Sequence, residues 1–147
     1  MNQRRKWRVT HGSFLTRQVI CYGGGGAGPI DGNPDMLSSY RSELGGILTI
    51  LFLLTQLGEY YEITAGTVVL YCDNEGALDN VFDEFPKRGI CPLLARDYDL
   101  LGAARALWRS LPITVNKQWV KGHYKGNQRE TKHDLNDLTD SLAKNFQ

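Results

Sequence analysis

The sequence has little of what would mark a specialised class of protein. Its three cysteines, Cys21, Cys72 and Cys91, are too few and too scattered for a disulfide scaffold, and no Cys-x-x-Cys pair suggests zinc. We therefore expect reduced thiols in an intracellular protein, cytoplasmic or nuclear. Neither sign of charge dominates, because 17 Lys and Arg residues face 16 Asp and Glu residues. This balance excludes a histone-like polycation but leaves room for a local basic groove.

Long hydrophobic runs are also missing. The most apolar stretch, residues 44–57, is shorter than the roughly 20 residues of a membrane-spanning helix and contains glycine, threonine and glutamine. Residues 1–12 form a basic lead-in that lacks the apolar segment of a signal peptide. With 147 residues, 41% of them hydrophobic and 22% charged, the chain is expected to be one soluble globular domain without a membrane segment.

The periodicity of apolar residues predicts an α/β domain with a partly parallel sheet. Strands are expected over residues 14–22, 67–73 and 113–120, where β-favouring residues gather, and the apolar run 67–73 suits a central strand covered on both faces. The glycine-rich residues 23–34 are interpreted as a flexible connection, because they lack the Lys-Ser/Thr ending of a phosphate-binding loop.

Helices are expected between and after these strands. The first begins at Ser38 or Ser39 and is ended by Gly58, with an apolar stripe that makes it mostly buried. A short helix is predicted over residues 74–81 and a long one from Pro92 to Leu111. Residues 121–133 are interpreted as a polar loop. Asp134 then caps a last helix whose Leu135, Leu138, Leu142 and Phe146 point inward.

Three carboxylates occupy positions that suit a functional site. Asp73 ends the predicted central strand, where open α/β sheets bind their ligands. Glu43 lies one turn before Ile47, on the buried face of the first helix, and Asp140 shares a helix face with Asn136. Taken singly, each is better explained as a solvated surface residue.

Four short segments give these carboxylates a common context: Ser39-Tyr40-Arg41-Ser42-Glu43-Leu44, Leu70-Tyr71-Cys72-Asp73-Asn74, Trp119-Val120-Lys121-Gly122-His123, and Asn136 followed by Asp140-Ser141-Leu142-Ala143. In this order and spacing, over residues 14–145, they resemble the ribonuclease H family, in the variant that accompanies reverse transcriptases in retroelements. The resemblance implies a ribonuclease H-like mixed sheet with helices on both faces. It also implies a nuclease that cuts the RNA strand of RNA–DNA hybrids with two Mg²⁺ or Mn²⁺ ions. In this variant the domain is part of a larger reverse-transcriptase polyprotein.

The resemblance also assigns roles to single residues. It makes Glu43, Asp73 and Asp140 the catalytic metal ligands and gives His123 proton transfer or product release. It places Asn74 and Asn136 beside the hybrid. Phosphate contacts are assigned to three basic residues of the predicted loop: Lys121, Lys125 and Arg129.

Other polar and aromatic residues receive ordinary interpretations. His11 and His133 are treated as histidines without a catalytic role. Trp119 could stack on a substrate, but we expect it to be a core residue. The three carboxylates repel one another, which is unfavourable unless a cation neutralises them, and all-oxygen ligands favour Mg²⁺ or Mn²⁺ over zinc.

The sequence departs from the family pattern at its start. The family carries a fourth carboxylate in an Asp-Gly-Ser turn on its first strand, whereas residues 1–30 contain no Asp or Glu, and Asp31 falls in the glycine-rich segment. Either the first strand lies upstream or the element has decayed, so we expect the chain to be weakly active or inactive. Two alternatives remain: a catalytically dead nucleic-acid-binding remnant of the same fold, and a generic α/β interaction domain.

Overall fold

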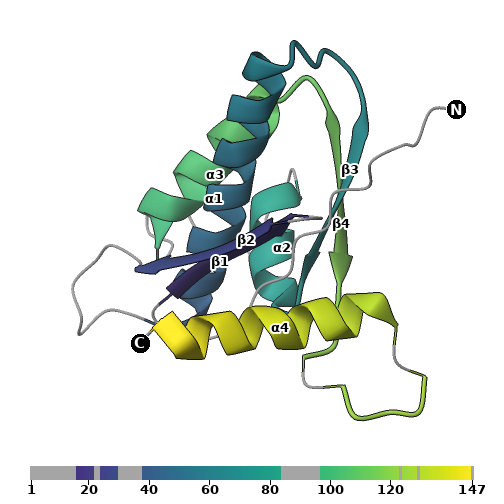
Figure 1. Cartoon of the computed structure of the whole chain (residues 1–147). Helices are drawn as coiled ribbons and strands as arrows, with labels where there is room; N and C mark the ends of the chain where they lie inside the picture. The colour runs from purple at the N-terminus through teal and green to yellow at the C-terminus, as the bar shows by residue number, and fades with distance from the viewer. Residues whose placement is uncertain are drawn as a thin grey trace, which may run out of the picture.

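The structure is a computed structural model that describes residues 16–21, 24–29, 38–83, 97–122, 124–128 and 130–146. It combines helices and strands (Figure 1). Their bounds are β1 (Thr16–Cys21), β2 (Gly24–Pro29), α1 (Ser39–Tyr60), β3 (Thr67–Cys72), α2 (Glu75–Phe82), α3 (Tyr98–Ser110), β4 (Thr114–Trp119) and α4 (Thr131–Phe146). None of the helices in these ranges is long and apolar enough to cross a membrane.

The described strands form two separate pairs. β1 and β2 are antiparallel, with Thr16 opposite Pro29, and β3 and β4 are parallel, with Cys72 opposite Trp119. The parallel pair confirms the predicted partly parallel arrangement. The interpretation of the glycine-rich segment as a loop is wrong for residues 24–29, which form β2. Glycine has a low β-propensity, but strand pairing uses backbone groups that glycine also carries. Residues 22–23 and 30–37, Asp31 among them, lie outside the described part.

Helix α1 begins where the sequence predicted and ends later. The Ser38 hydroxyl accepts a hydrogen bond from the Arg41 backbone N–H at 3.1 Å, which confirms the predicted N-cap. The predicted end at Gly58 is wrong, since the helix continues to Tyr60. The Gly58 carbonyl accepts a hydrogen bond from the Ile63 backbone N–H at 2.8 Å, so the chain reverses after this glycine rather than at it.

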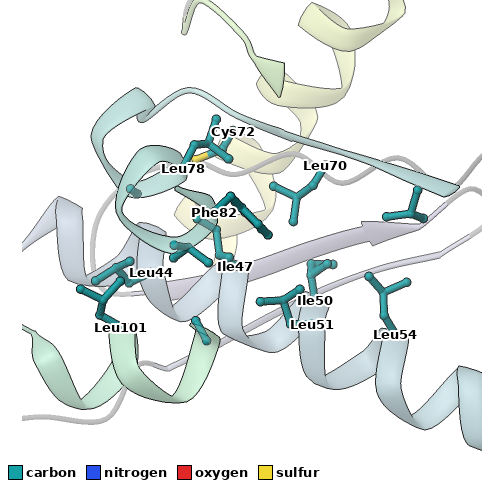
Figure 2. Packing of buried hydrophobic residues seen from close by; sticks show 14 residues of the cluster. Leu44, Ile47, Ile50, Leu51, Leu54, Leu70, Cys72, Leu78, Phe82 and Leu101 are labelled. Atoms are coloured by element: carbon teal, nitrogen blue, oxygen red, sulfur yellow. The ribbon is translucent and has the colours of Figure 1, made fainter. Parts of the chain in front are cut away.

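The hydrophobic core lies between α1, β3, α2 and α3 (Figure 2). In α1 the buried apolar residues recur at helical spacing, whereas β3 buries every second residue. The other face of β3 is half-buried, so the expected coverage of both faces is only partial. The Phe82 and Trp108 rings add an edge-to-face contact between α2 and α3, with centroids 5.5 Å apart. The buried members are Leu44, Ile47, Ile50, Leu51, Leu54, Val68, Leu70, Cys72, Ala77, Leu78, Val81, Phe82, Leu101 and Ala104.

The last two helices differ from their predicted bounds. In the described part α3 begins at Tyr98, and the expected start at Pro92 falls outside that part. α4 begins at Thr131, so Asp134 lies in its first turn instead of capping it. The inward orientation predicted for Leu138 is also wrong, because this side chain is 50% exposed.

Helix α4 instead buries a polar side: His133, Asn136, Thr139 and Asp140. Two residues along a helix correspond to a rotation of about 200°, so Leu138 points roughly away from Asn136. Since α4 packs against β1 and β2, only one of these sides can be buried.

Ion pairs join elements at the edges of the core. Arg41 of α1 reaches Asp97 at 2.9 Å and Asp99 at 2.7 Å, which ties the starts of α1 and α3 together. Lys117 of β4 contacts Asp79 at 2.6 Å and Asp83 at 2.5 Å, which ties the parallel pair to α2. These contacts fix the helices around the strand ends, where the predicted carboxylates lie.

The Arg41 pair predicts a pH dependence of stability. The hydrogen bond from Arg41 lowers the pKa of the Asp99 carboxyl below its ordinary value of 3.8. A carboxyl whose pKa is lower in the folded than in the unfolded state stabilises the fold. This stabilisation is complete at pH values above the unfolded-state pKa, and it is lost as the pH falls through the folded-state pKa. We expect Arg41→Gln to destabilise by about 3 kcal/mol at neutral pH, because the buried Asp97 carboxylate loses its ion pair with Arg41. The difference should shrink as the pH falls below 3.8 through the lowered pKa of Asp99.

Urea unfolding of both chains at several pH values measures this difference. Arg109→Gln, at an exposed position of α3, should show little effect at any pH. A difference in unfolding free energy between wild type and Arg41→Gln that does not shrink at pH values well below 3.8 would contradict the ion-pair explanation.

A second prediction concerns the turn after α1. Glu62 has a φ of 52°, the left-handed conformation that glycine adopts without strain. Glu62→Gly should stabilise the fold by about 0.5–1 kcal/mol. Glycine relieves the backbone strain of the left-handed conformation, and its larger conformational entropy in the unfolded chain offsets part of that gain. Glu59→Gly, three residues earlier inside the helix, should instead destabilise by about 1 kcal/mol. Urea titrations measure the change in unfolding free energy for each variant. Changes of the same sign for Glu62→Gly and Glu59→Gly would refute the conformational argument.

Candidate metal site

One end of the molecule gathers the elements that carry the predicted site residues. In Figure 1 the start of α1, the carboxyl ends of β3 and β4, and helix α4 all lie at the lower end. β3 and β4 end together because they are parallel and in register, with Cys72 beside Trp119. The carboxyl ends of parallel strands are the usual place for ligand binding in α/β folds.

Glu43 and Asp73 approach each other at this end. Together with Cys72 they form a group whose potential ligand atoms all lie within 4.8 Å of one another. Glu43 sits in the first turns of α1 and is only 4% exposed, because it shares the helix side that faces the core. Asp73 directly follows β3 and is half-buried. The structure therefore brings together two of the three predicted carboxylates.

Cys72 is the member of this group that sequence reasoning missed. Its thiol donates a hydrogen bond to Glu43 Oε2 at 3.3 Å and accepts one from the Asn74 backbone N–H at 3.4 Å. Burial raises the pKa of this thiol well above its ordinary value, and the negative charge of Glu43 adds to the rise. The protonated thiol thus acts as a donor that orients Glu43. The two-residue period of β3 puts Cys72 on the buried side with Leu70, and that signal could have found it.

Asp73 is positioned from β4 and the residues that follow it. The Trp119 indole N–H donates a hydrogen bond to the Asp73 backbone oxygen at 3.0 Å. A Cβ atom on Gly122 would come within 3.0 Å of Asp73 Oδ2, so the backbone of residue 122 can lie this close because it carries no side chain. The prediction that Trp119 is a core residue is wrong, since it is 49% exposed.

Asp140, the third predicted carboxylate, is 5% exposed in α4 and does not belong to the Glu43–Cys72–Asp73 group. Convergence of all three carboxylates on one pair of ions stays a prediction. One turn away, Asn136 is 1% exposed, and neither its amide oxygen nor its amide nitrogen has a hydrogen-bond partner in the part of the chain that the structure describes. Buried amides are normally paired, so this one is unusual.

The remaining predicted residues fall into three groups. Asn74 caps α2, where its side-chain oxygen accepts a hydrogen bond from the Ala77 backbone N–H at 3.0 Å. Lys121 and Lys125 are exposed in the segment between β4 and α4, as phosphate contacts would require. His123 and Arg129 lie outside the described residues, as does His11.

His133 is a structural residue in the start of α4. It is 7% exposed, and its ring stacks on Tyr124 with centroids 4.3 Å apart. Its Nδ1 accepts a hydrogen bond from the Glu130 backbone N–H at 3.0 Å, which satisfies a backbone donor at the beginning of the helix.

The donor set fits a hard divalent cation. Two ionised carboxylates at this separation repel by about 3–4 kcal/mol at an effective dielectric constant near 20, and a cation between them would reverse that term. Carboxylate oxygens are the ligands that Mg²⁺ and Mn²⁺ prefer. Glu43 and Asp73 are therefore the residues that could hold such an ion.

Comparison with known proteins adds no family to this description. No protein-family model matches the sequence, and no curated protein matches it significantly.

Metal binding should be visible as stabilisation of the fold. Mg²⁺ or Mn²⁺ at millimolar concentration should raise the melting temperature, because a ligand that binds only the folded state stabilises it by mass action. Asp73→Asn and Glu43→Gln should each remove most of this rise. Glu59→Gln removes the same charge from an exposed position on the same helix as Glu43 and should leave the rise intact. Melting curves that do not respond to either metal would count against the site.

Proposed function

We propose that this chain is a metal-dependent nuclease domain of the ribonuclease H type, acting on the RNA strand of RNA–DNA hybrids. One observation carries the proposal: Glu43 and Asp73, from different elements, place their carboxylates within 4.8 Å of each other at the carboxyl end of a parallel strand pair. The fold belonging to this proposal is a ribonuclease H-like mixed sheet with helices on both faces. In the described part, the antiparallel pair, the parallel pair and the helices are compatible with the coarser α/β class.

The surroundings of the carboxylates support a phosphate-containing substrate. Lys121 and Lys125 are exposed in the segment that leaves β4, next to Gly122, which touches Asp73. Lysines near a nuclease site bind backbone phosphates without reading sequence. A hybrid also presents a wide minor groove with 2′-hydroxyls, which lets a protein distinguish RNA from DNA. The proposal therefore combines a cation site with adjacent positive charge.

Each residue has a definite part in such a reaction. Glu43 and Asp73 would hold Mg²⁺ or Mn²⁺, with Asp140 as the further ligand that the resemblance implies. When bound, a pair of such ions activates water and stabilises the leaving oxygen in phosphodiester hydrolysis. Cys72 orients Glu43, and Trp119 holds the backbone of Asp73. The resemblance places Asn136 beside the hybrid, and its buried amide carries both a donor and an acceptor.

A binding module with the same fold is the second candidate. The observation that favours it is the lack of any Asp or Glu in residues 1–30. In the ribonuclease H family a fourth carboxylate lies on the first strand, before the segment that matches residues 39–44, and a domain without it could bind a hybrid but would cut it poorly. Both candidates require hybrid binding, and only the first requires metal-dependent cleavage. A generic interaction domain would require neither.

We expect the 147-residue chain to bind a hybrid and to cut it slowly. Loss of one electrostatic stabiliser typically lowers the rate by 10²- to 10³-fold, and an incomplete ligand set should cost at least that much. Cleavage of a labelled RNA strand, paired with DNA, should be followed in Mg²⁺ and in Mn²⁺. Residual cutting should disappear in Glu43→Gln and persist in Glu59→Gln.

Binding is measured separately by its salt dependence. Several phosphate contacts give a steep fall of log affinity with log salt, and Lys121→Ala should make the slope shallower by about one unit. Rapid Mg²⁺-dependent cutting that is lost in Glu43→Gln would show that another residue completes the ligand set. A hybrid affinity that does not change with salt concentration would exclude both the nuclease and the binding module.

A further inference from the structure

Trp119 combines exposure with a fixed position beside the candidate metal site. Nearly half of its surface remains in solvent, at 49% exposed, although burying a tryptophan is strongly favourable. It occupies the last position of β4, opposite Cys72 in the parallel register. Its indole N–H donates to the Asp73 backbone oxygen at 3.0 Å. An exposed aromatic ring is thereby anchored to the residue that carries one of the two carboxylates.

The anchor makes the ring a rigid surface. A hydrogen bond at the N–H edge restricts rotation of the indole, so little side-chain entropy is left to lose when another flat group stacks on it. Lys121, two residues further along the chain, is also exposed and carries a positive charge. An aromatic face together with a cation is the usual combination in proteins that bind single-stranded nucleic acid.

Two other exposed aromatic residues, Tyr60 and Tyr61, lack this setting. Tyr60 and Tyr61 follow one another at the end of α1 and pack edge-to-face on each other, with centroids 4.8 Å apart. Figure 1 places the end of α1 at the top of the molecule, opposite the carboxyl ends of β3 and β4. Tyr60, at 79% exposed, is therefore a matched control: an exposed aromatic far from the carboxylates.

We propose that Trp119 stacks on an unpaired base next to the phosphate bound at the Glu43–Asp73 group. This inference rests on the proposed function and adds a substrate class to it. Bases inside a hybrid already stack on their neighbours, so an indole can reach a free base face only where pairing ends. The favoured substrate is a hybrid that continues into a single strand at the site, rather than a blunt hybrid.

The test compares a blunt hybrid with the same hybrid extended by unpaired nucleotides on one strand. Affinities are measured by fluorescence anisotropy with Ca²⁺ as the divalent cation. We expect the extension to raise the affinity of the wild-type chain about 5- to 100-fold, the usual range for stacking one base on an aromatic side chain. Tyr60→Ala should leave this gain unchanged.

Two substitutions of Trp119 separate stacking from structure. Trp119→Phe and Trp119→Leu both lose the N–H donor, but only Phe keeps a flat ring. We expect Phe to retain most of the gain and Leu to lose it, with similar melting temperatures for the two variants. Equal gains in Phe and Leu, or weakening of blunt and extended hybrids alike in Leu, would overturn the proposal.

Failure of the inference can be told from failure of the nuclease proposal. Suppose that the chain cleaves the hybrid in a metal-dependent way, and that the affinity gained from the unpaired extension is the same in Trp119→Leu as in the wild type. Base stacking by Trp119 is then overturned, while the nuclease proposal stands. The opposite result is a chain that neither cleaves the hybrid nor gains melting temperature with Mg²⁺, but whose affinity gain from the extension requires an aromatic ring at position 119. This result supports base stacking in the second candidate, the binding module. Absence of any gain in the wild-type chain overturns the inference by itself.

Discussion

Burial of the Glu43 carboxylate is the constraint from which the candidate site follows. A carboxylate that is 4% exposed loses most of its hydration, and this is tolerated only with hydrogen bonds or a counter-charge. Glu43 cannot avoid the interior, because it lies one turn before Ile47 on the side of α1 that packs into the core. The Cys72 thiol supplies one hydrogen bond. Folding of the core thus brings the acid to the end of β3.

Helix α1 is central to the arrangement. It contacts α3, β1 and α2, and its buried side forms the middle of the core (Figure 2). Arg41, two residues before Glu43, fixes the start of the helix to α3 through Asp97 and Asp99. The position of Glu43 is therefore held by packing along the whole helix and by an ion pair at its beginning. A site built on such an element is rigid before any ligand arrives.

The sequence predicted those features that depend on periodicity and capping. Ser38 as N-cap, the extent of β3 and the placement of Glu43 and Asp73 near each other all follow from local patterns and from the geometry of parallel strands. β2 escaped prediction because its residues 24–29 are mostly glycine, so its existence depends on pairing with β1 and leaves no side-chain signal. The exposure of Trp119 depends on what packs against the end of β4, which no local pattern encodes.

Helix α4 shows why the polar side of an element can be buried at the expense of an apolar one. A helix that exposes Leu138 and buries Asn136 opposes the usual pattern, and an unpaired buried amide costs about 1–3 kcal/mol. Such departures from local rules tend to occur at functional positions, where stability is exchanged for an interaction with a ligand. The departure holds for residues 131–141, the part of α4 whose burial the structure describes. Because α4 packs against β1 and β2 there, a ligand could reach the Asn136 amide only if this packing opened locally.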